Sequence, residues 1–133
     1  MNTRKVALMI FYDKQKKILL QERKTISKVG EEWGFFGGKI KSGETPDQAI
    51  KREIKEELDY EIHVYKFLGI SKQKIAPELY VEGHIFIAPL GNKMSQFKLQ
   101  EGDGMKLFSF SEAKQLKMVT GDNQVIEIIE KSI

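Results

Sequence analysis

The chain has 133 residues, of which 41% are hydrophobic and 31% charged, an ordinary balance for a globular protein. The net charge of +3 is too small to indicate nucleic-acid binding, and the lack of cysteine excludes disulfides and thiolate metal sites. Residues 1–17 have no signal-peptide pattern, and no apolar run approaches transmembrane length. We therefore expect one cytoplasmic domain, residues 1–133, that binds neither nucleic acid nor membrane.

Apolar runs predict strands before and after a central helix. The expected strands cover residues 5–12, 17–23, 61–74, 79–88 and 105–110. Between them we expect a polar loop at 24–34, a glycine loop at 37–44, a helix from Pro46, a short helix capped by Ser111, and an amphipathic helix at 121–133. Strands interrupted by helices in this way predict an α/β fold, with a mixed sheet and helices on both faces.

The central helix has strong local signals. Thr45 is a favoured N-cap residue, and Pro46 suits the first helical position. Ile50, Ile54 and Leu58 fall on one stripe at about 100° per residue. This helix is therefore expected to pack its apolar stripe on the sheet.

Glu53, Glu56 and Glu57 crowd three carboxylates into five positions bordering that stripe. Like charges this close repel by roughly 0.2–0.5 kcal/mol per pair, which a bound cation would offset. Carboxylate oxygens suit Mg²⁺, which is commonly shared with a substrate phosphate. The three glycines of residues 37–44 let the backbone approach a ligand closely. The stretch indicates a Mg²⁺–phosphate site, and the alternative is a solvated charged helix.

Residues 38–60, GKIKSGETPDQAIKREIKEELDY, resemble the Nudix box of the Nudix hydrolases. Seven residues match the family pattern at the required spacing: Gly38, Glu44, Arg52, Glu53, Ile54, Glu56 and Glu57. The pattern's final Gly and aliphatic residue are replaced by Asp59 and Tyr60. Because Asp tolerates the left-handed region better than most residues, we interpret Asp59 as a helix stop that leaves the chemistry intact.

The resemblance extends over essentially the whole chain and implies the Nudix-type α/β/α sandwich with a mixed β-sheet. It is strongest to the MutT-like subfamily, although Phe35-Phe36 stands where that subfamily usually has Phe-Pro before the double glycine. The family hydrolyses a nucleoside diphosphate linked to another group. Mg²⁺, or Mn²⁺ in its place, is expected to neutralise developing charge and position the attacking water.

The resemblance also assigns roles to single residues. The implied metal ligands, with Glu56 acting directly or through water, are Glu53, Glu56, Glu57 and the carbonyl of Gly37 or Gly38. Arg52 is expected to orient a box glutamate, and Glu44 to hold the loop against the helix. Lys39 lies where it can assist a phosphate or an activated water, unless it simply faces solvent.

Glu101 stands in a glycine-containing loop before the strand expected at 105–110. MutT-type enzymes carry a Glu in such a loop, which reaches the metal and can act as general base. Asp103 competes with Glu101 for this role. The alternative is that Glu101 is a solvated loop carboxylate.

Three residues are candidates for binding a nucleotide. Asn123 resembles the MutT-type Asn that reads a purine edge, because an amide both donates and accepts, and the alternative is a cap or first-turn Asn. Phe35 could flank a base, although a core position is common for Phe. Arg23 could contact a phosphate, or be a surface arginine.

Three functions fit these residues. The first is MutT-like hydrolysis of a (d)NTP, oxidised or not, to (d)NMP and pyrophosphate. The second is hydrolysis of ADP-ribose or another nucleotide derivative, since some ADP-ribose members carry a Pro after the box and Pro77 is such a residue. The third is a non-catalytic nucleotide-binding module, which typically loses box glutamates that this chain keeps. A monomer and a homodimer are both compatible with the sequence.

Overall fold

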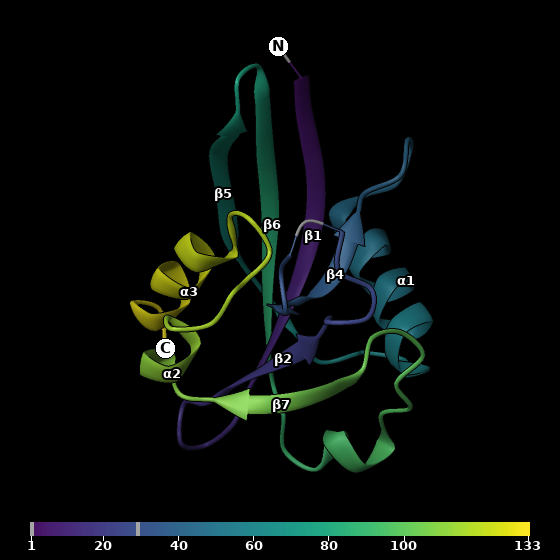
Figure 1. Cartoon of the computed structure of the whole chain (residues 1–133). Coiled ribbons are helices and arrows are strands. Elements are labelled where there is room, and N and C mark those ends of the chain that lie inside the picture. Colours follow the sequence, from purple (N-terminus) through teal and green to yellow (C-terminus); the bar gives the residue numbers. More distant parts are fainter. Residues whose placement is uncertain (1, 29) are drawn as a thin grey trace.

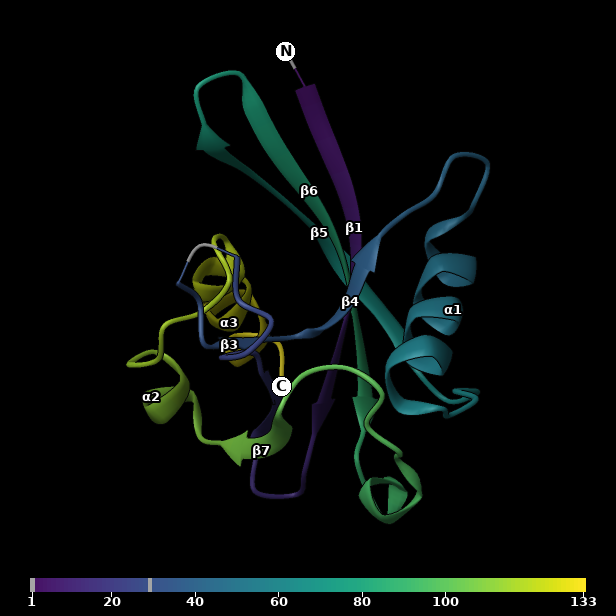
Figure 2. The ribbon, with the colours of Figure 1, turned by 45° about the vertical axis from the view of Figure 1, so that its right-hand side comes forward.

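In the computed structural model, which describes residues 2–28 and 30–133, helices lie on both faces of a mixed β-sheet (Figure 1, Figure 2). The elements are β1 (Asn2–Tyr12), β2 (Ile18–Glu22), β3 (Trp33–Gly34), β4 (Phe36–Lys39), α1 (Pro46–Leu58), β5 (Lys66–Ala76), β6 (Leu79–Pro89), the 3₁₀ helix η1 (Lys93–Gln96), β7 (Gly104–Phe108), α2 (Phe110–Ala113) and α3 (Asp122–Glu130). Helix α1 covers one face, and α2 and α3 lie together on the other (Figure 2).

Strand β1 lies at the centre of the sheet. It runs parallel to β6, and β6 pairs antiparallel with the edge strand β5. Strand β4 pairs antiparallel with the middle of β1, where Ala7 lies opposite Gly38. Strand β2 follows β1 in an antiparallel hairpin and pairs with both β3 and β7. The parallel β1–β6 pair among antiparallel neighbours confirms the predicted mixed sheet.

Helix α1 forms where the sequence predicted it and for the predicted reasons. The Thr45 hydroxyl accepts from the Gln48 backbone amide, while the Gln48 side chain accepts from the Thr45 amide, which forms a capping box. Asp59 ends the helix in the left-handed conformation, with φ 48° and ψ 43°, so its interpretation as a helix stop is confirmed. The stripe of Ile50, Ile54 and Leu58 is fully buried in the core cluster between α1 and the sheet.

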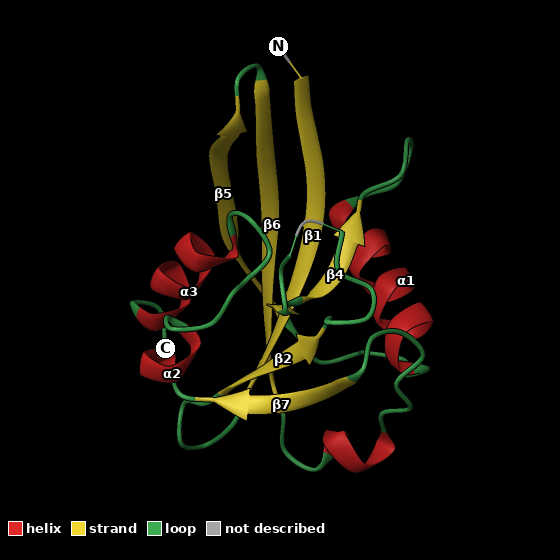
Figure 3. Cartoon of the chain, in the orientation of Figure 1, coloured by secondary structure: helices red, strands yellow, loops and turns green. Residues whose placement is uncertain are grey.

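The second core cluster fills the opposite face of the sheet, beneath α2 and α3. Val125, Ile126 and Ile129 of α3 pack there with strand residues such as Ile10 and Leu20. Two apolar layers on one sheet therefore give the α/β/α order that the resemblance implied (Figure 3).

Several expected boundaries were wrong. The strand expected from residue 61 begins at Lys66, and the strand expected at 105–110 is β7, ending at Phe108. Ser109, not Ser111, caps α2, because Ser109 and Glu112 form a reciprocal capping box. Residues 33–34 form a strand at the end of the expected polar loop, and residues 36–39 form a strand that extends into the expected glycine loop.

Strand β4 requires glycine because it lies so close to β1. A Cβ at Gly37, where φ is +133°, would collide with the carbonyl of Ala7. In the described ranges, no helix has the length and apolarity needed to cross a bilayer.

Candidate active site

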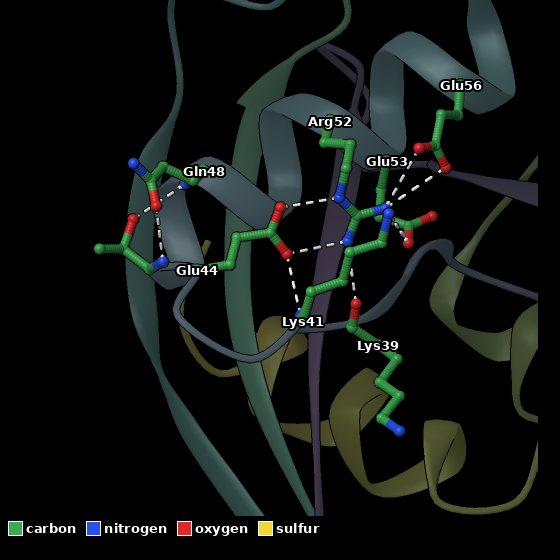
Figure 4. A network of polar contacts seen from close by, with 8 residues as sticks. Lys39, Lys41, Glu44, Gln48, Arg52, Glu53 and Glu56 are labelled. Atoms are coloured by element: carbon green, nitrogen blue, oxygen red, sulfur yellow. Dashed lines mark hydrogen bonds and ion pairs between the residues drawn. The ribbon is translucent and has the colours of Figure 1, made fainter.

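Arg52 fastens the glycine segment to helix α1. Its guanidinium binds the Glu44 carboxylate with two hydrogen bonds of 2.7 and 2.9 Å and also donates to the Lys39 carbonyl at 3.0 Å (Figure 4). The same group reaches Glu53 at 2.9 Å and the exposed Glu56 at 3.3 Å. The Arg52 hydrogen bonds, followed by one from the Lys41 amide, lower the pKa of Glu44 to about 2. Arg52 is therefore placed to orient Glu53 against β4.

Glu57 is buried, with 3% of its surface exposed, although the sequence placed it only at the border of the apolar stripe. The reason is helical spacing: Glu57 follows Ile50 by seven residues and Ile54 by three, so it shares their buried face. The Gly37 amide donates to Glu57 Oε1 at 2.7 Å. Burial, and after it the charges of Glu53 and Glu101, raise the pKa of Glu57 to about 9 against the opposing Gly37 hydrogen bond.

Glu53 lies directly against Gly38. A Cβ at Gly38 would come within 2.6 Å of Glu53 Oε1, so a larger residue there would displace the carboxylate. Burial raises the pKa of Glu53, Arg52 opposes this, and the charges of Glu56 and Glu101 raise it further. The carboxylates of Glu53, Glu57 and Glu101 are thus close enough to repel one another.

The carboxylate oxygens of Glu53, Glu57 and Glu101 are suitable ligands for a hard divalent cation, although they are not gathered into a closed metal site. Among the described residues, no three His, Cys, Asp or Glu side chains are gathered closely enough to form a metal cage. Glu53 and Glu57 of α1 and Glu101 of the facing loop repel one another, and all three offer oxygen ligands, which suit Mg²⁺ or Mn²⁺. A cation between them would relieve the repulsion and take the place of the proton that burial favours on Glu57.

The loop at residues 101–103 carries both candidates for the general base, Glu101 and Asp103, and their contacts distinguish them. The Glu101 carbonyl accepts from Gln21 Nε2 at 3.0 Å, and the Glu101 charge acts on Glu53 and Glu57. The Asp103 carboxylate instead accepts hydrogen bonds from the hydroxyl and, secondly, the amide of Thr25, which lower its pKa. Of the two, Glu101 is the one coupled to the α1 carboxylates.

The candidate nucleotide-binding residues lie in different surroundings. Arg23 is half-buried between Glu57 and Asp122, lowering the pKa of both, and within the described residues its Nε is a buried nitrogen with no hydrogen-bond partner. Phe35 is 4% exposed and packs in the second core cluster, which is the alternative considered for it. Asn123 is exposed in the first turn of α3.

Lys39 stands apart from the carboxylates. Its side chain is exposed, and its amino group points away from the Arg52 cluster (Figure 4). Only its backbone carbonyl takes part in that cluster, as an acceptor from Arg52. This placement corresponds to the solvent-facing alternative.

The sequence reasoning missed Asp122. This residue is 7% exposed, accepts a 3.3 Å hydrogen bond from the Phe35 amide, and lines a cavity of about 30 Å³ between β1, β5, β6 and the start of α3. Burial raises its pKa to about 7, while the Phe35 amide and Arg23 oppose the rise. Helical spacing carried the signal, because Asp122 precedes the apolar residues Val125, Ile126 and Ile129 by three, four and seven positions.

Comparison with known proteins identifies the family. The model of the NUDIX domain matches residues 1–127. The 8-oxo-dGTP diphosphatase of Proteus vulgaris is 35% identical over 57 residues, which cover 43% of this chain and about half, 51%, of that protein. The CTP pyrophosphohydrolase of Escherichia coli (strain K12) is 26% identical over 111 residues, covering 84% of this chain and 80% of that protein.

Among solved structures, the MutT protein from Methanosarcina mazei Go1 superposes with a TM-score of 0.77 at 17% identity, covering 98% of this chain and 94% of that one. A mixed sheet between helices is thus a shared architecture. The chain belongs to the Nudix hydrolase family, and its relatives are MutT-like, so the resemblance found in residues 38–60 is confirmed.

Proposed function

We propose that the protein is a divalent-metal-dependent, MutT-like Nudix pyrophosphohydrolase that converts a (d)NTP, oxidised or not, to (d)NMP and pyrophosphate. The observation that carries this proposal is the position of Glu57, buried against the Gly37 amide and beside the Glu53 carboxylate that Arg52 orients. The names of the relatives support it, since they act on 8-oxo-dGTP and on CTP.

Each residue then has a chemical task. Glu53, Glu57 and Glu101, aided by Glu56 and the carbonyl of Gly37 or Gly38, would hold Mg²⁺ or Mn²⁺, which supplies charge neutralisation at the pyrophosphate and a polarised water. Arg52 fixes the orientation of Glu53 through a hydrogen bond of 2.9 Å, and Glu44 fixes Arg52 in turn. Glu101 accepts the proton of the attacking water, and the half-buried Arg23 contacts a phosphate.

The other two functions receive no support from a particular contact. ADP-ribose or another nucleotide derivative is the second candidate, and a non-catalytic nucleotide-binding module is the third. In every case the partner is a small nucleotide, bound by a cytoplasmic monomer or homodimer. A screen of the purified protein with Mg²⁺ against dNTPs, oxidised dNTPs, ADP-ribose and nucleotide sugars separates them. Triphosphates should release pyrophosphate, whereas ADP-ribose and nucleotide sugars would give two phosphomonoesters, so all products are resolved by ³¹P NMR. Cleavage of none of these substrates would favour the binding module.

Cleavage of a nucleoside triphosphate is expected to yield monophosphate and pyrophosphate. Attack of water at the α-phosphorus expels pyrophosphate, and attack at the β-phosphorus expels the monophosphate, so both give this pair of products, as in MutT-like pyrophosphohydrolysis. Product analysis by ³¹P NMR measures this directly. Diphosphate plus orthophosphate as the main products would contradict the proposal, and preferred cleavage of ADP-ribose would favour the second candidate.

Asn123→Ala is expected to weaken the binding of purine nucleotides more than that of pyrimidine nucleotides, with KM affected more than kcat. A lost hydrogen bond to a base edge acts on ground and transition states alike and amounts to about 0.5–1.5 kcal/mol. Because Gly121 is the N-cap of α3 and no side chain caps it, the substitution should leave the melting temperature nearly unchanged. An unchanged purine-to-pyrimidine ratio of kcat/KM would remove Asn123 from the base site.

A further inference from the structure

Gln21 is a fully buried amide one residue before the end of strand β2. Its exposed fraction is 0%, and its backbone lies opposite Gly34 of β3 on one side and Met105 of β7 on the other. A buried polar side chain is costly unless both ends of the amide are satisfied. The partners of this amide therefore indicate what it is there to do.

The two ends of the Gln21 amide reach two different parts of the candidate active site. Its oxygen accepts a 2.8 Å hydrogen bond from Arg23 Nη1, and its nitrogen donates a 3.0 Å hydrogen bond to the Glu101 carbonyl. Arg23 is the cation between Glu57 and Asp122, and Glu101 is the loop carboxylate whose charge acts on Glu53 and Glu57.

The loop that carries Glu101 is also packed onto Gln21. A Cβ at Gly102, where φ is +86°, would lie 3.1 Å from both Cγ and Nε2 of Gln21 and 2.7 Å from the Glu22 carbonyl. The next amide, that of Asp103, donates to the same Glu22 carbonyl at 2.9 Å. Only glycine at 102 allows this approach, so the position of Glu101 depends on the end of β2 and on the Gln21 side chain.

We propose that Gln21 is a positioning residue, which holds Arg23 at the substrate phosphate and the Glu101 loop at the metal, and so couples the two. An amide suits this task because it accepts from the guanidinium and donates to the carbonyl at once. A carboxylate at position 21 would repel the carbonyl, and an apolar side chain would release both groups. This role rests on the proposed function, in which Arg23 and Glu101 act on the substrate.

The test replaces Gln21 by Met, which keeps the volume and removes both hydrogen bonds. Ser109→Ala is the matched control, because it breaks a capping box on α2, away from the site. Q21M is expected to lower kcat by about 10–100-fold, the scale of lost supporting contacts, and to raise KM several-fold. S109A should lower the melting temperature without changing either constant.

Double variants separate coupling from simple loss of structure. Residues that act together have non-additive effects. In a protein that already carries Glu101→Gln, adding Q21M should therefore lower kcat by no more than about threefold. In a protein that already carries Arg23→Gln, adding Q21M should not raise KM further. Additive effects in both backgrounds would overturn the proposal. So would a parent-like kcat for Glu101→Gln.

Two measurements decide about Gln21 without turnover. Hydrogen exchange at the Asp103 amide should be faster in Q21M and unchanged in S109A. Mn²⁺ affinity, measured by EPR, should likewise fall in Q21M and keep the parent value in S109A. If the parent protein cleaves no nucleotide, the proposed function fails while these readouts still test whether Gln21 holds the loop. Parent-like exchange and Mn²⁺ affinity in Q21M would overturn the proposal.

Discussion

Replacing Glu57 by Gln is expected to lower turnover of any nucleotide substrate by about 10³-fold, the scale seen when one preorganised electrostatic group is lost. The amide is a neutral and poorer ligand for Mg²⁺, and Glu57 is the carboxylate most enclosed by the glycine strand. Steady-state kinetics at saturating Mg²⁺, with circular dichroism as the check on folding, measures the loss. Turnover within a few-fold of the parent would remove Glu57 from the metal site.

The fold should survive Glu57→Gln because the buried Gln keeps the hydrogen bond and the neutral charge that the site favours without metal. Gln can still accept from the Gly37 amide, and at neutral pH it replaces a carboxyl group whose raised pKa of about 9 keeps it protonated in the metal-free protein. The melting temperature without metal should therefore change little at pH 7. Glu127→Gln, an exposed carboxylate on α3, is the matched control and should retain parent turnover.

The parts of the fold that follow from local signals were predicted well. Helix α1 begins and ends where Thr45, Pro46 and Asp59 place it, because capping and left-handed φ act within a few residues. The error at Ser111 was also local: the capping-box partner Glu112 lies three residues after Ser109, and that spacing could have been recognised. The strands β3 and β4 could not, since only pairing with β2 and β1 makes these short segments extended.

The candidate site was predictable where one helix and one loop carry it, and incomplete where distant segments meet. Arg52 lies beside Glu44 and Glu53 as the box spacing implies. Gln21 and Glu101 are 80 residues apart, and their contact exists only because β2 pairs with β7. Sequence patterns give the face of an element and not what packs on it, so Gln21 could not be assigned from sequence.

Asp122 was missed for a different reason: a carboxylate at the start of a helix is typical of a first-turn acid favoured by the helix dipole. The structure buries it instead, where burial raises its pKa from an ordinary 3.8 to about 7. Because the folded state binds this proton more tightly, the contribution of Asp122 to stability is greatest below pH 4, falls as the pH rises to about 7, and is constant above that.

Asp122→Asn should therefore remove this pH dependence and raise the free energy of unfolding at pH 8 by up to about 4 kcal/mol, which is the pKa difference expressed as energy. The Asn oxygen can still accept from the Phe35 amide, so the geometry is preserved. Urea unfolding between pH 4 and pH 9, on the parent and the variant, measures the effect.

Asp103 supplies a control of opposite sign. Hydrogen bonds from Thr25 lower the pKa of Asp103, so its contribution is present at neutral pH and is lost as the pH falls through the folded-state pKa. Asp103→Asn should thus destabilise at pH 8, where Asp122→Asn stabilises. If Asp122→Asn lowers stability at pH 8 as well, Arg23 holds the carboxylate in its charged form and outweighs the effect of burial. The direction of one measured change thus decides whether attraction to Arg23 or loss of water governs the acid at the start of α3.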